Sequence, residues 1–113
     1  MENVAYKIFR ASEWAQFQRD GNFAGSPADQ ADGFIHLSTR AQVAGTLAAH
    51  FAGATGLVLA AINLAALGAA VRWEPARGGT LFPHLYGVLT PDLVLSVEML
   101  AQIGPAGNGA AQA

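Results

Sequence analysis

The 113-residue sequence contains no cysteine, so it can form neither a disulfide nor a thiolate metal site. Charge is also scarce, because Asp, Glu, Lys and Arg make up only 12% of the residues and the formal net charge is -2. This balance provides no broad basic surface for nucleic-acid phosphates and no polybasic segment for anionic membranes. The partner that bulk charge predicts is therefore a small molecule or another protein, with neither nucleic acid nor membrane.

The first ten residues lack the charged segment and apolar core of a secretory signal, so a cytoplasmic location is expected. Residues 41–71 contain no Asp, Glu, Lys or Arg, and a run of this length raises the alternative of a membrane span. However, His50, Asn63 and four glycines interrupt the run, and much of its apolar content is alanine. A helix, a buried strand and a short second helix account for this segment better.

The pattern along the chain predicts a single domain over residues 1–103 and a disordered tail over residues 104–113. Ser12 is expected to cap a first helix ending at Gly21, and Thr39 with Gln42 forms a capping box for a second helix ending near Gly53. Residues 21–33 are rich in Gly, Asp and Pro and predict an ordered loop. Strands are expected over residues 4–9, 34–38, 57–62, 70–74 and 93–100, with a helical turn over residues 64–67. The expected class is α+β, a small domain with short mixed strands and two main helices.

The first candidate site is "GFIHLS", residues 33–38. Alternation along a strand places Ile35 and Leu37 on one face and His36 with Ser38 on the other. An imidazole and a hydroxyl on the face away from the core are suited to a ribose hydroxyl or a phosphate oxygen. A structural histidine bonded to a backbone carbonyl is the alternative reading of His36.

The second candidate is "RWEPARGGTLFPHLYG", residues 72–87, which concentrates polar and aromatic groups in a chain otherwise poor in charge. Arg72 and Arg77 offer planar donors for phosphate or carboxylate. Gly78 and Gly79 are either an anion-binding nest of amide groups or an ordinary turn.

Four more residues of this segment carry chemistry. Trp73 and Tyr86 either stack on a ligand ring or fill the core. Glu74 either forms a structural ion pair with an arginine or faces a developing cation. Pro83 is expected to hold His84 on a rigid loop, so His36, Glu74 and His84 are the candidate catalytic residues.

His50 follows Leu47 on the apolar side of the predicted helix, which is typical of a core or interface histidine. No histidine stands at helical spacing from another, so we assign no metal. Ser38 lacks a nucleophile elbow, and a Ser-His-Asp hydrolase is weakly supported.

The segments "AGSPADQADGFIHLST", "HFAG" and "RWEPARGGTLFPHLYGVL" together resemble the bacterial domain of unknown function family 952 from Val4 to about Leu100. That family is similar to the ADP-ribosylation fold of ADP-ribosyltransferases and of the RNA 2'-phosphotransferases that use NAD, whose "VHLS" is similar to "IHLS" here. The resemblance implies a cleft for NAD, ADP-ribose or a related phosphorylated nucleoside, with His36 placed against ribose or phosphate. Glu98 lies on the last predicted strand, but its neighbours do not match the glutamate motif of many transferases.

Three functions remain open from the sequence. The first is a transferase-like enzyme on an ADP-ribose-type substrate, and the second is a module that senses a nucleotide or binds a protein without turnover. The third is an oligomeric partner subunit that uses its alanine-rich helix as an interface.

Overall fold

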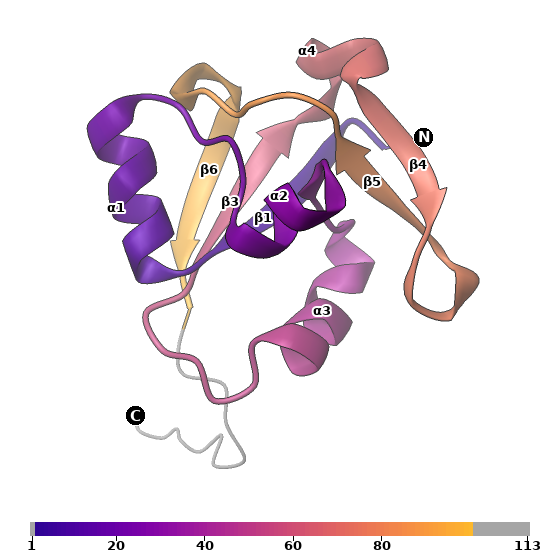
Figure 1. Cartoon of the computed structure of the whole chain (residues 1–113), viewed down its shortest axis with the longest axis horizontal. Helices are drawn as coiled ribbons and strands as arrows, with labels where there is room; N and C mark the ends of the chain where they lie inside the picture. The colour runs from indigo at the N-terminus through magenta and orange to yellow at the C-terminus, as the bar shows by residue number, and fades with distance from the viewer. Residues whose placement is uncertain (1, 101–113) are drawn as a thin grey trace.

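The structure is a computed structural model that describes residues 2–100, so the predicted tail over residues 104–113 lies outside the described part. The fold is α+β and contains two three-stranded antiparallel sheets (Figure 1). One sheet has the order β1-β3-β6 and the other has the order β2-β5-β4. The strands are β1 (Val4–Phe9), β2 (Ile35–His36), β3 (Val58–Asn63), β4 (Val71–Pro75), β5 (Leu81–Leu85) and β6 (Val94–Met99).

Within the described residues, four α-helices connect the strands. They are α1 (Ala11–Asp20), α2 (Pro27–Asp32), α3 (Val43–His50) and α4 (Leu64–Leu67). Single 3-10 turns occur at Arg40–Gln42, Gly68–Ala70, Arg77–Gly79 and Pro91–Leu93. As expected, α1 and α3 are the two main helices.

The central strand of the first sheet is β3, which confirms the prediction from its apolar sequence. Its residues 58–62 are all buried, as a strand covered on both faces requires. Asn63 then caps α4 by accepting from the backbone N–H of Ala66 at 3.2 Å, and Gly68 ends that helix, both as predicted.

The main core lies on the face of the first sheet that α1 and the second sheet cover. Phe9 of β1 is its centre, with ring centroids 5.5 Å from Phe17 of α1 and 5.0 Å from Phe23. Trp14 packs against the edge of the same cluster. Each fully buried ring of this kind contributes about 1.5–3 kcal/mol to the free energy of unfolding.

A smaller core lies on the opposite face of the first sheet, under α3. Ile8 and Leu59 of the sheet pack there with Val43 of α3, and Leu47 and Phe51 lie partly buried beside them. Thr39 begins this segment with the predicted capping box, in which its hydroxyl accepts from the Gln42 N–H. The two faces of β1 therefore anchor different parts of the chain.

The two sheets meet at the edge strand β1. Tyr6 exchanges two backbone hydrogen bonds with Ser38, at 2.8 and 2.9 Å, so the segment after β2 continues the first sheet. Ile35 and Leu37 point into the main core while His36 and Ser38 face away from it, as the alternation predicted. This junction brings α2, β2, α3 and the β4–β5 hairpin around one edge.

Four expectations need correction. The first helix is capped by Arg10 instead of Ser12, because the Glu13 carboxylate accepts from the Arg10 backbone N–H at 2.8 Å and satisfies the earlier start. Residues 21–33 contain α2 as well as loop. The segment around Pro83 is the strand β5 instead of a rigid loop, and the Pro83 carbonyl accepts from the Leu37 N–H at 3.1 Å. Within residues 2–100 the pairing of the strands is antiparallel throughout, where mixed strands were expected.

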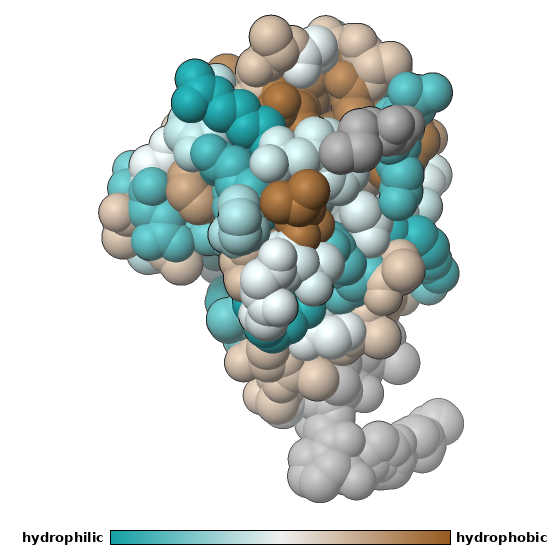
Figure 2. Space-filling model, turned by 90° about the vertical axis from the view of Figure 1, so that its right-hand side faces the viewer, coloured by the Kyte–Doolittle hydropathy of each residue, from teal (hydrophilic) through white to brown (hydrophobic). Residues whose placement is uncertain are grey.

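Figure 2 shows the molecule from the side of β4 and β5. Hydrophilic and near-neutral colours cover much of that face, and the hydrophobic colour lies near the top, at the end where α4 lies in Figure 1, with a smaller patch near the middle. Within residues 2–100, no helix has both the length and the apolar character needed to cross a membrane.

Candidate functional site

A cleft of about 570 Å³ lies at the junction of the two sheets. Its volume falls in the range of about 300–1,000 Å³ that is typical of small-molecule sites. Residues from every element around the β1 edge line it: Tyr6, Lys7, Ile8, Arg10, Glu13, Ser26, Pro27, Ala28, Asp29, Asp32, His36, Leu37, Ser38, Thr46, His50, Phe51, Ala76, Arg77, Phe82 and His84.

The cleft brings together four of the ten residues singled out from the sequence. These are His36, Ser38, Arg77 and His84. Glu74 is joined to the cleft through a hydrogen bond to His84. The other five, Arg72, Trp73, Gly78, Gly79 and Tyr86, are not among the lining residues.

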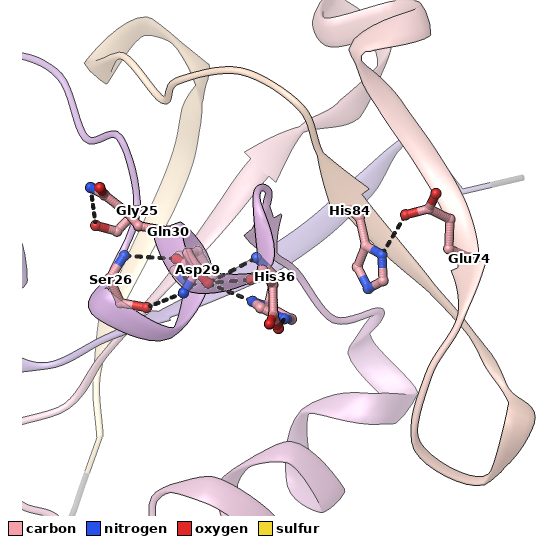
Figure 3. A network of polar contacts seen from close by, with 9 residues as sticks. Gly25, Ser26, Asp29, Gln30, His36, Glu74 and His84 are labelled. Atoms are coloured by element: carbon pink, nitrogen blue, oxygen red, sulfur yellow. Dashed lines mark hydrogen bonds and ion pairs between the residues drawn. The ribbon is translucent and has the colours of Figure 1, made fainter.

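The buried carboxylate of Asp29 organises one wall of the cleft (Figure 3). Its Oδ1 accepts from the backbone N–H of His36 at 3.1 Å and lies 2.6 Å from Nδ1 of the same residue. Its Oδ2 accepts from Lys7 Nζ at 2.8 Å and from the Ser26 N–H at 2.9 Å. One side chain therefore connects α2 to β1 and β2.

Local sequence explains why α2 forms at all, since six residues are too few for a stable isolated helix. Ser26 is its N-cap and Pro27 its first residue, while Gly33 ends it with a φ of 88° and donates to the Asp29 carbonyl. Before the helix, Gly25 has a φ of 121°, and a Cβ there would lie 2.7 Å from the Asp29 Cβ. Only glycine fits this close approach.

The charges around Asp29 determine the protonation states of Asp29 and His36. Hydrogen bonds from His36 and Lys7 outweigh burial and hold the pKa of Asp29 well below its usual value of 3.8. In return, the hydrogen bond to Asp29 raises the pKa of His36 above 6.5, and Asp32 adds to the effect. Asp32 Oδ2 lies 2.9 Å from His36 Nε2, so both ring nitrogens donate to carboxylates and His36 is an imidazolium.

A second chain of polar contacts runs outward from His84. His84 Nδ1 lies 2.8 Å from Glu74 Oε1, and the Tyr86 hydroxyl donates to the same oxygen at 2.8 Å. These two donors lower the pKa of Glu74, and the carboxylate raises the pKa of Tyr86. The Arg72 guanidinium lies over the Tyr86 ring, 4.4 Å from its centroid. Glu74 thus bonds a histidine and a tyrosine, and the arginine ion pair considered from the sequence does not form within the described residues.

The remaining candidates make contacts with neighbouring parts of the fold. Trp73 packs partly buried against the main core. Gly79 donates to the Ala76 carbonyl at 2.8 Å within the hairpin turn, in which Gly78 has a φ of 69°. The Ser38 hydroxyl is 2.9 Å from the Thr46 hydroxyl, so α3 and the end of β2 are joined inside the cleft.

Two arginines line the cleft without a carboxylate partner among residues 2–100. The Arg77 guanidinium lies 4.9 Å from the centroid of Phe82, and its Nη2 is close to Gly45, where a Cβ would lie 3.0 Å away. The Arg10 guanidinium lies 4.6 Å from the Phe51 centroid and donates to the His50 carbonyl at 3.4 Å. Both guanidinium groups therefore lie against α3 or the residue that follows it.

Of the two readings of His50, a core or an interface histidine, the core reading is wrong. Its side chain is exposed and lies at the cleft, because α3 packs on the sheet through Val43, Leu47 and the following Phe51. Within the described residues, no three His, Asp or Glu side chains form a group suited to a metal ion.

Sequence reasoning missed Lys7, Asp29 and Asp32. Alternation along residues 4–9 places Lys7 on the same face as Ala5 and Phe9, and a buried lysine requires a partner. That partner, Asp29, lies in a segment that was predicted to be a loop. However, Ser26-Pro27 with an acidic residue at the third helical position is a helix-start signature.

The fold and site define a small α+β domain with a cleft, lined by ionisable side chains, where two antiparallel sheets meet. A family model described as "Protein of unknown function (DUF952)" matches residues 8–97, and the chain belongs to this family. The comparison with curated proteins found no match.

The chain is also similar to solved structures of protein CC0527 from Caulobacter crescentus. Its crystal structure superposes with a TM-score of 0.82 at 43% identity, over 86% of this chain and 85% of that one. Its solution NMR structure gives a TM-score of 0.79 at 42% identity, over 88% and 86%.

Proposed function

We propose that the cleft binds a phosphorylated nucleoside, in the class of ADP-ribose or NAD. The observation that carries this proposal is the presence of Arg10 and Arg77 in the cleft without carboxylate partners. A guanidinium held over an aromatic ring keeps its in-plane donors free, and those donors match the oxygens of a phosphate.

The rest of the lining suits a nucleoside better than a free inorganic anion. Tyr6, Phe51 and Phe82 supply apolar surface, and polar groups line the same cleft. Bound ligands commonly need this combination of apolar walls and a few fixed polar groups. The family resemblance adds a ribose or phosphate contact for His36, which is the part of the proposal that favours ADP-ribose over other nucleotides.

Isothermal titration calorimetry with ADP-ribose, NAD, AMP and ribose 5-phosphate tests this proposal. The matched pair Arg77→Met and Arg72→Met separates the cleft from the outer face of the hairpin, because both arginines lie over an aromatic ring and only Arg77 lines the cleft. We expect Arg77→Met to weaken binding at least tenfold, and Arg72→Met to change it less than twofold. No binding of any of the four compounds would refute the proposal, and equal losses would move the ligand to the outer face.

Binding without turnover is the second candidate function. It is favoured by the hydrogen bonds that already satisfy the wall, because Asp29 accepts four of them and Ser38 is bonded to Thr46. A nucleotide sensor needs only a preformed wall of this kind. It would be stabilised by its ligand according to mass action and would yield no product on long incubation.

A further inference from the structure

Two histidines face each other across neighbouring strands of the second sheet. His36 of β2 and His84 of β5 are partners in the antiparallel register, and their ring centroids are 5.6 Å apart at an angle of 70°. Both residues line the cleft. The backbone ladder therefore sets the distance between the two imidazoles.

Each of the two rings is oriented by a carboxylate at Nδ1. Asp29 holds His36, and Glu74 holds His84 (Figure 3). A carboxylate at Nδ1 fixes the orientation of an imidazole and leaves Nε2 to act on a substrate. Phe34 further fixes His84 by stacking on it, with centroids 4.0 Å apart and an angle of 20°.

The remaining nitrogens of the two rings differ in what they can do. His36 Nε2–H donates a hydrogen bond to Asp32, whose side chain is 55% exposed and free to turn away. His84 Nε2 has no hydrogen-bond partner among the described residues, and Figure 3 shows the second ring nitrogen directed away from Glu74. With Nδ1–H donated to Glu74, Nε2 is a proton acceptor. One ring can thus give a proton while the other takes one.

We propose that His84 and His36 act as general base and general acid in the hydrolysis of a phosphodiester of mononucleotide size, such as a nucleoside 2',3'-cyclic phosphate. This inference rests on the proposed function, because Arg10 and Arg77 are needed to hold the nonbridging phosphate oxygens.

The reaction is balanced with water as the only co-reactant. His84 Nε2 takes a proton from water, whose oxygen forms a new bond to phosphorus. The bond from phosphorus to the leaving ribose oxygen breaks, and His36 Nε2 protonates that oxygen as Asp32 turns away. The product is a phosphate monoester with a free hydroxyl, and solvent then returns the proton from His84 to His36.

The cleft is poorly suited to two other hydrolytic reactions. The Ser38 hydroxyl is bonded to Thr46 and the Ser26 hydroxyl accepts from the Asp29 N–H, so neither serine of the cleft is poised as a nucleophile for acyl transfer. Glycoside hydrolysis needs two carboxyl groups on either side of the bond. Of the three carboxylates that line the cleft, Asp29 is buried, Asp32 is bonded to His36, and Glu13 accepts from the Arg10 backbone N–H.

The experiment follows adenosine 2',3'-cyclic phosphate by anion-exchange chromatography, in water enriched in oxygen-18. We expect AMP that contains one heavy oxygen, and a bell-shaped pH profile that requires one protonated and one unprotonated histidine. His84→Ala should lower kcat about hundredfold while KM changes less than threefold. Arg72→Met is the control, because Arg72 is not among the lining residues, and it should keep kcat within twofold.

A second substrate separates the two roles. Bis(p-nitrophenyl) phosphate releases a phenolate that needs no general acid, so His36→Asn should retain its hydrolysis while losing that of the cyclic nucleotide. Asn at this position keeps an N–H for Asp29 and so protects the fold. Glu74→Gln tests a positioning residue, and it should lower kcat about tenfold and change the pH profile without raising KM.

The outcomes distinguish this inference from the proposed function. Calorimetric binding of the cyclic nucleotide with no AMP formed would overturn the acid–base assignment and leave the proposed function standing. Absence of binding by the cyclic nucleotide and by all four nucleotides and sugars above would overturn both. Hydrolysis undiminished in His84→Ala would also overturn the assignment.

Discussion

Replacement of Asp29 by Asn should remove a large part of the stability of this domain. The two oxygens of Asp29 face only donors, and one of these is the ammonium of Lys7, whose side chain is 7% exposed. An Asn side chain turns an NH₂ group toward two of those donors and leaves Lys7 as a buried charge without a carboxylate, bonded to the His36 carbonyl at 3.3 Å. Breaking a buried ion pair in this way costs about 3–5 kcal/mol. Because a domain of this size is stabilised by about 5–15 kcal/mol, the loss should be readily measured.

Equilibrium unfolding in urea at pH 7 measures this loss, with Asp32→Asn as the matched control. Asp32 carries the same carboxylate three residues later but is 55% exposed, so its replacement should cost less than about 1 kcal/mol. Lys7→Met removes the charge that Asp29→Asn would leave unpaired, and its flexible apolar chain can fill the same space. In the Lys7→Met background, the destabilisation caused by Asp29→Asn should be smaller by at least about 1 kcal/mol than the cost of about 3–5 kcal/mol expected with Lys7 present.

Two results would refute this reasoning. A loss below about 1 kcal/mol for Asp29→Asn would mean that the wall is held by packing instead of by the carboxylate. An equal loss with and without Lys7 would mean that the ammonium is solvated in the variant. In either case the organising role given to Asp29 would be wrong.

Three further predictions concern the same region. Because the pKa of His36 is raised, its pairing with Asp29 stabilises the fold fully below pH 6.5, and this stabilisation is lost as the pH rises through the raised pKa. Imidazole NMR titration and urea unfolding across this range should show the loss, and the Asp29→Asn variant should show no such pH dependence. Gly25→Ala should destabilise the domain by more than about 1 kcal/mol in thermal unfolding, because the new methyl group meets the Asp29 Cβ and φ is positive. Gly45→Ala should stabilise α3 by up to about 1 kcal/mol yet weaken ligand binding several-fold in calorimetry, since its Cβ displaces the Arg77 guanidinium.

Short-range signals in the sequence were sufficient for much of the fold. Caps at Thr39 and Asn63, the stop at Gly21 and the alternation around His36 depend on neighbours within four residues, and the structure shows each of them. The apolar run that forms β3 was equally informative, because a strand buried on both faces has no polar face to display.

The sheet order and the partners within the site depend on contacts between distant parts of the chain. Lys7 and Asp29 are 22 residues apart, and Glu74 reaches His84 from the neighbouring strand. No local pattern states which carboxylate will meet which histidine. The loop reading of residues 21–33 failed for a different reason, since Gly, Pro and Asp are common both in loops and at helix ends.

The residues proposed for acid–base chemistry and those proposed for phosphate binding belong to different segments of the cleft. Both histidines belong to one backbone ladder of the second sheet, whereas Arg10 and Arg77 reach the cleft from a strand end and a hairpin turn and lie against α3. Small side chains make up most of α3, so its surface can be rebuilt by single substitutions. Under the proposed function, substitutions in α3 and at the two arginines could therefore change ligand preference without altering the paired imidazoles.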